Sequence, residues 1–550
     1  MSSLPDPVTV EVIRNAFNSI ASQMNNNLAR SAYTPVIYEM KDCSVAVFDR
    51  DIRLLGQAPG LPIFLGGLDT AIELTVEHFG GIEGLRPGDV FAVNDSSLVG
   101  SHLNDVTVLA PCFDGDELIG FAATKAHWRD IGAKSPGHAM DTIEIFQEGY
   151  RLGPTRLYDA GRPEEGILEL LQRNSRLPRG VWGDLHAQVA ACRTGERGLQ
   201  GLHRRFGPDT VARASKAIFA QCERSDRAAV SALADGVWEA AGDLDSWGPG
   251  GEPVPVRVQV RIRGDQLTLD LRGSSKQTPG SVNCGRPQTI SAARLAFKFV
   301  VNPLEAVTDG TFRNFEVVMD RGSVFDAQPP AACQYYYPHL GLMIDLFLRA
   351  LSEPCPERVV AGQPADAMNV LFTGRDADTG RQYVCGEATG VGWGAHAGGD
   401  GTNGLANYGA GDLKNLPIEV IECRYPLRVH RYAVRPGSGG AGRWRGGLGV
   451  VREYETLTDD TAVSLWWERT RTPGWGLLGG EPGASGTVTV ETPSGCAEVL
   501  KVDRMPLPKG SRVVACTGGG GGFGPPEERA ADARQRDLEE GYIPPAGGGT

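Results

Sequence analysis

Several features that define common protein classes are missing from this chain of 550 residues. No G-x-x-x-x-G-K-[ST] segment occurs, so we expect no nucleotide-binding P-loop here. The eleven cysteines are scattered singly without a C-x-x-C pair. This spacing argues against a disulfide framework or a thiolate zinc site and fits a reducing cytoplasm.

Basic tracts and long apolar runs are missing as well. The formal net charge is -13, with 54 Lys and Arg against 67 Asp and Glu. Because binding to phosphate-rich polymers needs clustered basic residues, we expect neither nucleic acid nor a membrane surface as a partner. The amino terminus has no cationic segment before an apolar core, and the apolar run 340–351 is interrupted by Asp345 and Arg349. We therefore expect no signal peptide, no membrane span, and a small molecule or protein as the partner.

Glycine and proline, in contrast, are abundant, with 73 and 36 residues. They favour many turns and a β-rich architecture, and the length is too great for a single core. We predict a multidomain α+β fold, β-rich with helical segments and with mixed or antiparallel sheets. The expected domains are 1–245, a central α+β domain over 250–435, and a β-rich carboxyl-terminal domain over 436–550 with a short helix and a tail.

Hydrophobic periodicity locates several elements. Asp6 and Pro7 predict the start of an amphipathic helix, and apolar residues from Ile13 to Leu28 recur at helical spacing. A helical pattern covers 166 to about 240, and strict alternation over 254–263 predicts a strand of a half-buried hairpin. Further predictions are a helix over 289–301, short strands over 447–515, a charged helix over 527–540 and a frayed tail at 544–550.

The stretch 94–150 carries the strongest indication of chemistry. Two apolar runs, 106–113 and 118–124, flank the turn Asp114-Gly115-Asp116 and predict an antiparallel hairpin. If the same number of residues is counted outward on both sides of the turn, residue 105 pairs with residue 125. His127 then lies beside His102 and Asp105. Two imidazoles and a carboxylate at one end of a hairpin predict a divalent metal site. Loop capping and a buried hydrogen-bonded histidine are the alternative.

Other polar residues nearby are weaker candidates. Asp130 and His138 are predicted catalytic or proton-transfer residues, and Asp141 and Glu144 could orient the metal ligands. A surface-loop role remains open for each of them. His186 and His203 fall within a helical pattern without a histidine or acidic partner at matching spacing, so we expect them to be scaffold.

Glycine-rich segments offer further possibilities. The loop 390–411 contains His396 and Asp400, and it could approach a ligand or form a domain or subunit contact. Residues 437–442 match G-x-G-x-x-G, but turn and strand patterns follow, whereas a dinucleotide site needs a helix there. Residues 517–526 predict a glycine hinge or a tight wrap.

Five blocks of sequence give a resemblance to a known family. They are KDCSVAVFD (41–49), GSHLNDVTVLAP (100–111), KAHWRDIGAKSPG (125–137), NLPIEVIECRYPLRVHRY (415–432) and SGGAGRWRGGLGVVREYE (438–455). Together they resemble the hydantoinase B/oxoprolinase family, which includes subunits of ATP-dependent hydantoinases, caprolactamase, 5-oxoprolinase and acetone or acetophenone carboxylases. The resemblance implies a metal held by Asp42, His102, Asp105 and His127; taken alone, Asp42 reads as a turn residue.

The resemblance also implies a division of labour between chains. ATP and magnesium would bind to a separate hydantoinase A-type subunit, in a heterotetramer or larger complex, with no cofactor-binding residues for ATP in this chain. The expected function is the metal-containing subunit of an ATP-dependent hydrolase of cyclic amides such as hydantoins, lactams or oxoproline. The alternatives are a subunit of a ketone carboxylase and a non-catalytic assembly subunit. The two His and two Asp ligands suit zinc first, with manganese or iron(II) also open.

One block departs from the family pattern. Family members often read N-D-P-Y-x-G-G-T-H-L-P-D where this chain has NDSSLVGSHLND. The ligand positions are kept, while Ser96, Ser97, Val99, Ser101 and Asn104 differ, so the sequence leaves the shape of the pocket and the substrate open.

Overall fold

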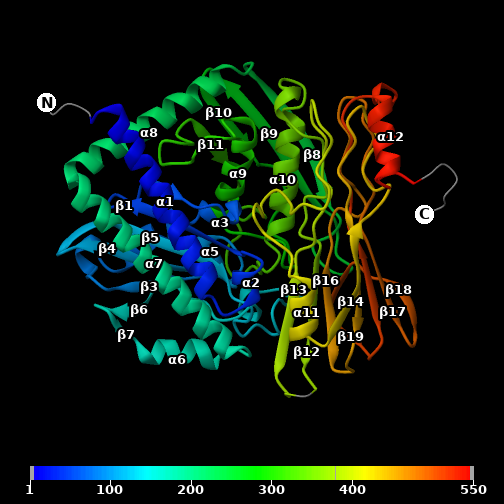
Figure 1. Cartoon of the computed structure of the whole chain (residues 1–550), viewed down its shortest axis with the longest axis horizontal. Helices are drawn as coiled ribbons and strands as arrows, with labels where there is room; N and C mark the ends of the chain where they lie inside the picture. Colours follow the sequence, from blue (N-terminus) through cyan, green and yellow to red (C-terminus); the bar gives the residue numbers. More distant parts are fainter. Residues whose placement is uncertain (1–4, 378, 545–550) are drawn as a thin grey trace.

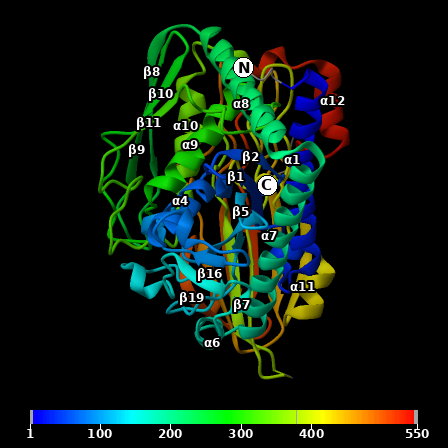
Figure 2. The same ribbon diagram turned by 90° about the vertical axis from the view of Figure 1, so that its left-hand side faces the viewer.

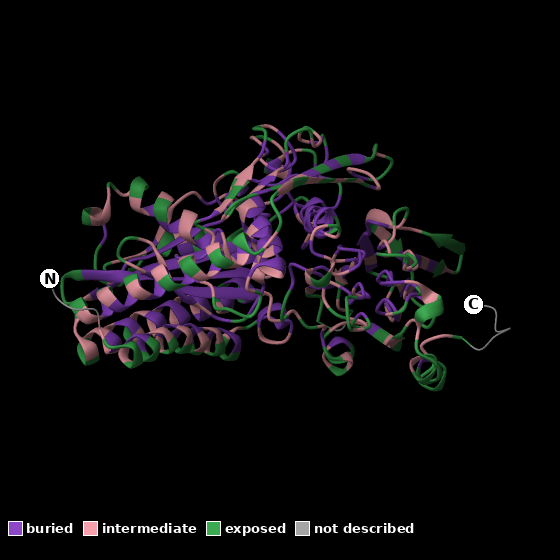
Figure 3. Ribbon diagram, turned by 90° about the horizontal axis from the view of Figure 1, so that it is seen from above, coloured by how far each residue is buried: buried purple, intermediate pink, exposed green. Residues whose placement is uncertain are grey.

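The computed structural model describes residues 5–377 and 379–544. Its amino-terminal part is built on a seven-stranded antiparallel sheet of order β2-β1-β5-β4-β3-β6-β7. The strands are β1 (Cys43–Asp49), β2 (Leu54–Gln57), β3 (Val90–Val93), β4 (Asp105–Asp114), β5 (Glu117–His127), β6 (Thr155–Asp159) and β7 (Arg162–Pro163). β4 and β5 are buried along nearly their whole length, so the sheet is covered on both faces (Figure 3).

Helices cover the two faces of this sheet. The long helices α1 (Pro7–Ser31) and α7 (Pro178–Phe206) run side by side over one face, and α4 (Leu68–His78) packs on the other (Figures 1 and 2). The Asp6 side chain accepts a hydrogen bond from the Thr9 amide and Pro7 is the first helical residue, which confirms the predicted helix start. α6 (Glu165–Arg173) and α8 (Pro208–Ser231) flank α7 in the sequence.

A second sheet, of order β11-β10-β9-β8, carries the predicted hairpin. Its strands are β8 (Gly236–Leu244), β9 (Val254–Arg263), β10 (Gln266–Asp270) and β11 (Phe315–Val318), and the helices beside it are α9 (Arg286–Val300) and α10 (Tyr337–Ala350). β9 alternates buried Val and Ile with exposed residues, as predicted. The expected helical pattern up to residue 240 is wrong at its end, because α8 stops at Ser231 and residues 236–244 pair with β9.

Two further antiparallel sheets form the carboxyl-terminal half, on the opposite side of the molecule from α1 and α7 (Figure 1). One contains β12 (Asn369–Arg375), β13 (Gln382–Glu387), β16 (Thr461–Trp466) and β19 (Lys501–Leu507). The other contains β14 (Leu427–Val434), β15 (Val450–Thr456), β17 (Thr487–Thr492), β18 (Gly495–Glu498) and β20 (Arg512–Cys516). The helices here are α11 (Ile418–Arg424) and the charged α12 (Ala531–Glu539).

Short helical turns complete the description. They are α2 (Pro35–Tyr38), α3 (Pro62–Leu65), α5 (Ser96–Val99) and the 3-10 turns Ile82–Gly84, Ile145–Gln147, Pro356–Arg358 and Pro526–Glu528. The structure confirms the predicted α+β class with several mixed or antiparallel sheets. The three-domain division stays a prediction. Of the expected tail, only Pro544 lies among the described residues.

Backbone-to-backbone packing dominates the region around residues 518–522, which we call the glycine stack. The amides of Gly519, Gly520, Gly521 and Gly522 donate hydrogen bonds of 2.8–3.0 Å to four carbonyls in three other segments of the chain. A Cβ at Gly520 would lie 2.0 Å from the carbonyl oxygen of Trp393, and one at Gly519 would lie 1.8 Å from that of Ser438. Of the two predicted alternatives, the segment is therefore a tight wrap. The residues after 442 lead into β15 without a helix, as expected for a coincidental G-x-G-x-x-G match.

No helix in the described part of the chain is long and apolar enough to cross a lipid bilayer.

Candidate metal centre

The ends of three neighbouring strands meet at the candidate site. β4 begins at Asp105, and β5 ends at His127 directly opposite it. β1 pairs with β5 on the other side, and the amide of His127 donates to the carbonyl of Asp42, just before β1. Antiparallel pairing thus brings together residues that are far apart in the sequence.

The predicted register of this hairpin is wrong by two residues. Equal counting placed residue 105 opposite 125, whereas Asp105 pairs with His127. The turn pairs Asp114 with Glu117, and a register shift between Cys112 and Phe113 adds one more residue on the β5 side. Because side chains alternate with a period of two, the shift leaves His127 on the predicted face of the sheet.

Hydrogen bonds link the histidines through Asp105. His102 Nε2 lies 2.8 Å and His127 Nδ1 3.0 Å from the same oxygen, Asp105 Oδ1. His138 Nε2 lies 3.1 Å from His127 Nε2. One nitrogen of each of the three histidines lies within 4.8 Å of the other two. The structure therefore joins His138, predicted as a catalytic residue, to the predicted metal ligands.

Two carboxylate oxygens at this site, Asp42 Oδ1 and Asp105 Oδ2, are buried without a hydrogen-bond partner among the described residues. Burial, and then the charge of Asp105, raise the pKa of Asp42 to about 7. Burial also opposes ionisation of Asp105, but His102 and His127 outweigh it and hold its pKa far below the usual range. A buried anionic oxygen without a donor is costly, so these two oxygens favour a nearby cation.

Two of the three histidines are held in the neutral form that metal coordination needs. Burial lowers the pKa of His127 to about 4 and that of His138 well below its usual value. Burial acts the same way on His102, but Asp105 and the Gln334 carbonyl raise its pKa overall. His127 and His138 are therefore neutral near pH 7, with lone pairs available to a metal ion.

A cavity of about 100 Å³ opens onto this cluster. Its lining includes Asp42, Asp105 and the three histidines together with residues from four other segments: Phe64, Gln334, Tyr335, Tyr336, Tyr337, Asn369, Asn407 and Gly409. Part of the glycine-rich loop 390–411 thus lines the cavity. Its two polar candidates lie elsewhere, since Asp400 pairs with Arg529 and His396 is exposed.

Sequence patterns contain little indication of the residues that close the cavity. The Tyr336 ring lies 5.0 Å from His102, edge to face, and burial together with Asp105 raises the pKa of its hydroxyl. The Gln334 carbonyl lies 3.1 Å from His102 Nδ1. Buried Glu148 accepts hydrogen bonds from the amides of Cys333 and Gln334, which fixes this backbone. The signal that could have found them is the tyrosine run 335–337 before a helix.

The remaining predicted residues do not line the cavity. Asp130 is buried, but its carboxylate accepts from the Arg176 amide and guanidinium at 2.6 and 3.0 Å and from the Gly137 amide at 3.3 Å. It shapes the loop that carries His138. Asp141 pairs with Lys134 at the surface. Glu144 directly precedes the 3-10 turn Ile145–Gln147, and His186 and His203, which we expect to be scaffold, lie on α7.

A buried carboxylate–histidine cluster at the end of an antiparallel sheet, open to a small cavity, is typical of a metal-dependent enzyme. The Hydantoinase B/oxoprolinase family model matches residues 6–526, so the chain belongs to this family. It is 30% identical to the caprolactamase subunit beta of Pseudomonas jessenii, over 98% of this chain and 94% of that one.

Two solved structures have the same fold. The crystal structure of ATP-dependent caprolactamase from Pseudomonas jessenii superposes with a TM-score of 0.92 at 27% identity, covering 98% of this chain and 95% of that chain. A nucleotide-free acetone carboxylase gives a TM-score of 0.88 at 19% identity, covering 98% and 78%. At that identity the second likeness concerns the fold alone.

Proposed function

We propose that this chain is the metal-containing subunit of an ATP-dependent cyclic amide hydrolase. The observation that carries the proposal is the pair of buried, partnerless oxygens on Asp42 and Asp105 beside neutral histidine nitrogens. Family membership and the similarity to caprolactamase support the opening of a ring amide, such as a lactam, a hydantoin or oxoproline, as the reaction.

The residues present fit a divalent metal ion. Asp42, His102, Asp105 and His127 would hold it with two oxygen and two nitrogen atoms, a donor set that suits zinc and also manganese or iron(II). A bound ion of this kind polarises a carbonyl or lowers the pKa of bound water. All eleven cysteines are free, and burial raises the pKa of Cys43, next to Asp42, to about 12, so its thiol stays protonated and does not compete for the ion. Free cysteines also fit a reducing, cytoplasmic setting.

The other cavity residues would handle the substrate. His138 Nε2 is neutral and lies 3.1 Å from His127 Nε2, where it could accept or return a proton during ring opening. The Tyr336 hydroxyl stays protonated and can donate to a developing negative charge. Phe64 and Tyr337 form apolar walls that limit water and suit the hydrocarbon part of a ring.

The energy source would lie on another chain. The sequence contains no P-loop, and the similar caprolactamase chain is named a beta subunit of an ATP-dependent enzyme. We propose a hydantoinase A-type partner that binds ATP and magnesium, in a heterotetramer or larger complex. Coupling to ATP is chemically reasonable because an unactivated amide resists hydrolysis.

Metal analysis of the purified chain is the first test. We expect close to one equivalent of a divalent transition metal in the native chain and its loss in Asp42→Ala and His127→Ala. The two-subunit complex should then open members of a lactam and hydantoin panel only with ATP. His102→Ala should abolish this turnover while the complex still forms. Full activity of His102→Ala would instead support a non-catalytic assembly role.

A second candidate function is a subunit of an ATP-dependent ketone carboxylase, which the fold shared with acetone carboxylase favours. The same complex with ATP, a small ketone and labelled bicarbonate separates the two. Label appearing in an acid product would support the carboxylase, and ring opening without incorporation would support the hydrolase.

A further inference from the structure

A second, larger cavity of about 760 Å³ lies between the start of α7, the β12–β13 turn and the end of α11. It is strongly basic in a chain with a net charge of -13. One acidic side chain among the described residues, Asp376, lines it, against six arginines: Arg129, Arg176, Arg179, Arg375, Arg381 and Arg424. We call this cavity the arginine pocket.

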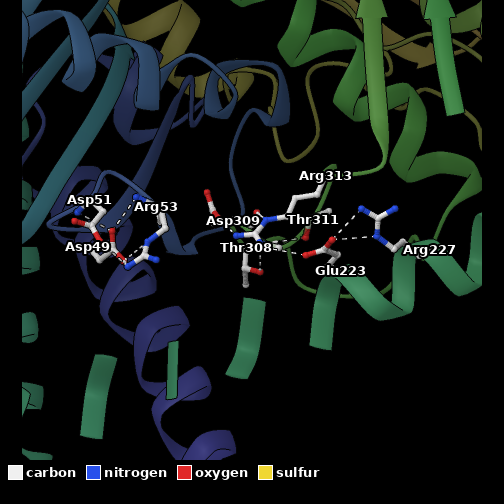
Figure 4. A network of polar contacts seen from close by, with 10 residues as sticks. Asp49, Asp51, Arg53, Glu223, Arg227, Thr308, Asp309, Thr311 and Arg313 are labelled. Atoms are coloured by element: carbon white, nitrogen blue, oxygen red, sulfur yellow. Dashed lines mark hydrogen bonds and ion pairs between the residues drawn. The ribbon is translucent and has the colours of Figure 1, made fainter. Parts of the chain in front are cut away.

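Five of these arginines lack a carboxylate partner among the described residues. Arg176 is compensated, because it pairs with Asp130 at 3.0 Å. Some arginines elsewhere are compensated as well. Figure 4 shows Arg53 between Asp49 and Asp51, and Arg227 and Arg313 sharing Glu223. Arg424 instead lies 5.7 Å from the centre of the Tyr38 ring. The arginine pocket therefore concentrates positive charge, because one of its six guanidinium groups is paired and the carboxylates that act on Arg129, Asp42 and Asp184, lie outside the pocket lining.

Arg129 sets this pocket apart from a solvated basic surface. Its side chain is buried, with 9% exposure of the residue. Its guanidinium donates to the Gly386 carbonyl at 2.8 Å and contacts Met40 Sδ at 3.5 Å. A guanidinium has five N–H donors, so several remain for a ligand. Arg129 also lines a small cavity of about 50 Å³ shared with Asp42, His127 and His138.

We propose that the arginine pocket is a binding site for a phosphate group. A phosphate monoester or inorganic phosphate carries close to two negative charges at neutral pH, and the planar fork of arginine matches its oxygens. The volume lies in the range of small-molecule sites and leaves room for an organic group attached to the phosphate. The exposed Tyr33 and half-buried Tyr425 provide flat walls for such a group. Phosphate binding in the arginine pocket does not require a metal ion at the candidate centre.

Calorimetric titration of the metal-free chain tests the proposal with two ligands, inorganic phosphate and glycerol phosphate. We expect saturable binding of at least one, and tighter binding of glycerol phosphate if the organic group is recognised. Arg179→Gln and Arg381→Gln, both at exposed positions, should each weaken binding by about tenfold. Arg263→Gln, an exposed arginine on β9 outside the pocket, is the matched control and should leave binding unchanged.

Several results would overturn the proposal. Absence of saturable binding to both ligands would do so, as would equal weakening in Arg263→Gln, which would indicate non-specific charge attraction. Binding of a hexaglutamate peptide without binding of either phosphate ligand would assign the pocket to an acidic protein segment instead. If Arg129→Gln lowers the thermal midpoint strongly, the two exposed variants decide the question.

Discussion

The glycine stack and the candidate metal centre are both buried and polar, but they differ in whether their polar groups have hydrogen-bond partners. In the stack, the amides of Gly519 to Gly522 each find a carbonyl at 2.8–3.0 Å. At the candidate centre, Asp42 Oδ1 and Asp105 Oδ2 find no donor. Since an unmatched buried oxygen costs stability, the difference separates a region that holds the fold together from one kept ready for a ligand.

Adding one methyl group to the stack should have the largest effect on stability. A Cβ at Gly520 would lie 2.0 Å from the Trp393 carbonyl oxygen, and backbone on both sides cannot move aside easily. We expect Gly520→Ala to lower the free energy of unfolding by about 3 kcal/mol or more, measured by urea denaturation.

Gly201→Ala is the matched control for that change. Gly201 lies on α7 with no atom within 4 Å of an added Cβ. Alanine should stabilise the helix there by up to about 1 kcal/mol. Equal stability of the two variants would show that the backbone of the stack adjusts easily to an added methyl group. The stack would then not be a region that holds the fold together.

Replacing His138 should affect catalysis rather than stability. If His138 transfers a proton, His138→Asn should lower kcat by about 100-fold or more while the metal content stays the same. His186→Asn is the control, because His186 lies on α7 and contacts Tyr158 away from the cavity. Loss of metal from His138→Asn would make this residue a ligand and would contradict the proton-transfer role.

The two regions also differ in how far the sequence predicted them. The alternation in β9 and the apolar runs of β4 and β5 predicted strands, and the pairing of β4 with β5 placed His127 beside Asp105. These are local patterns with a short turn between them. The tight wrap at 518–522 could not be told from a hinge, because its close contacts come from segments such as Trp393 and Ser438.

Long-range packing explains what the sequence did not show at the candidate centre. Tyr336 and Gln334 reach His102 from more than 230 positions away, and Glu148 fixes their backbone. Asp130 was expected near the chemistry because of its position in the sequence. Arg176, 46 residues later, binds its carboxylate instead. A single sequence has no periodicity that encodes such contacts.

Removing the metal should destabilise the native chain by a moderate amount. A ligand that binds only the folded state at about 100 times its Kd stabilises it by about 2.7 kcal/mol. We therefore expect a chelator to lower the thermal midpoint of the wild type and to leave that of His127→Ala unchanged, by differential scanning calorimetry. An equal shift in both proteins would mean that the metal binds outside the cluster.

The smallest effect is expected for Asp42→Asn in the metal-free chain, where an isosteric amide replaces an unmatched carboxylate. Burial raises the pKa of Asp42 to about 7, so its ionised form at pH 8 is disfavoured by the fold. The variant should be at least as stable as the wild type, within about 1 kcal/mol, by urea denaturation at pH 8.

Asp345→Asn is the matched comparison for that last change. Asp345 is buried, and unlike Asp42 it accepts from the Tyr408 hydroxyl at 2.9 Å and pairs with Arg469 at 3.1 Å. Removing its charge leaves the Arg469 guanidinium uncompensated, so we expect a loss of about 3 kcal/mol. If Asp42→Asn cost as much as Asp345→Asn, Asp42 would hold the fold together like the partnered carboxylate, and the distinction between a structural and a ligand-ready region would fail at this residue.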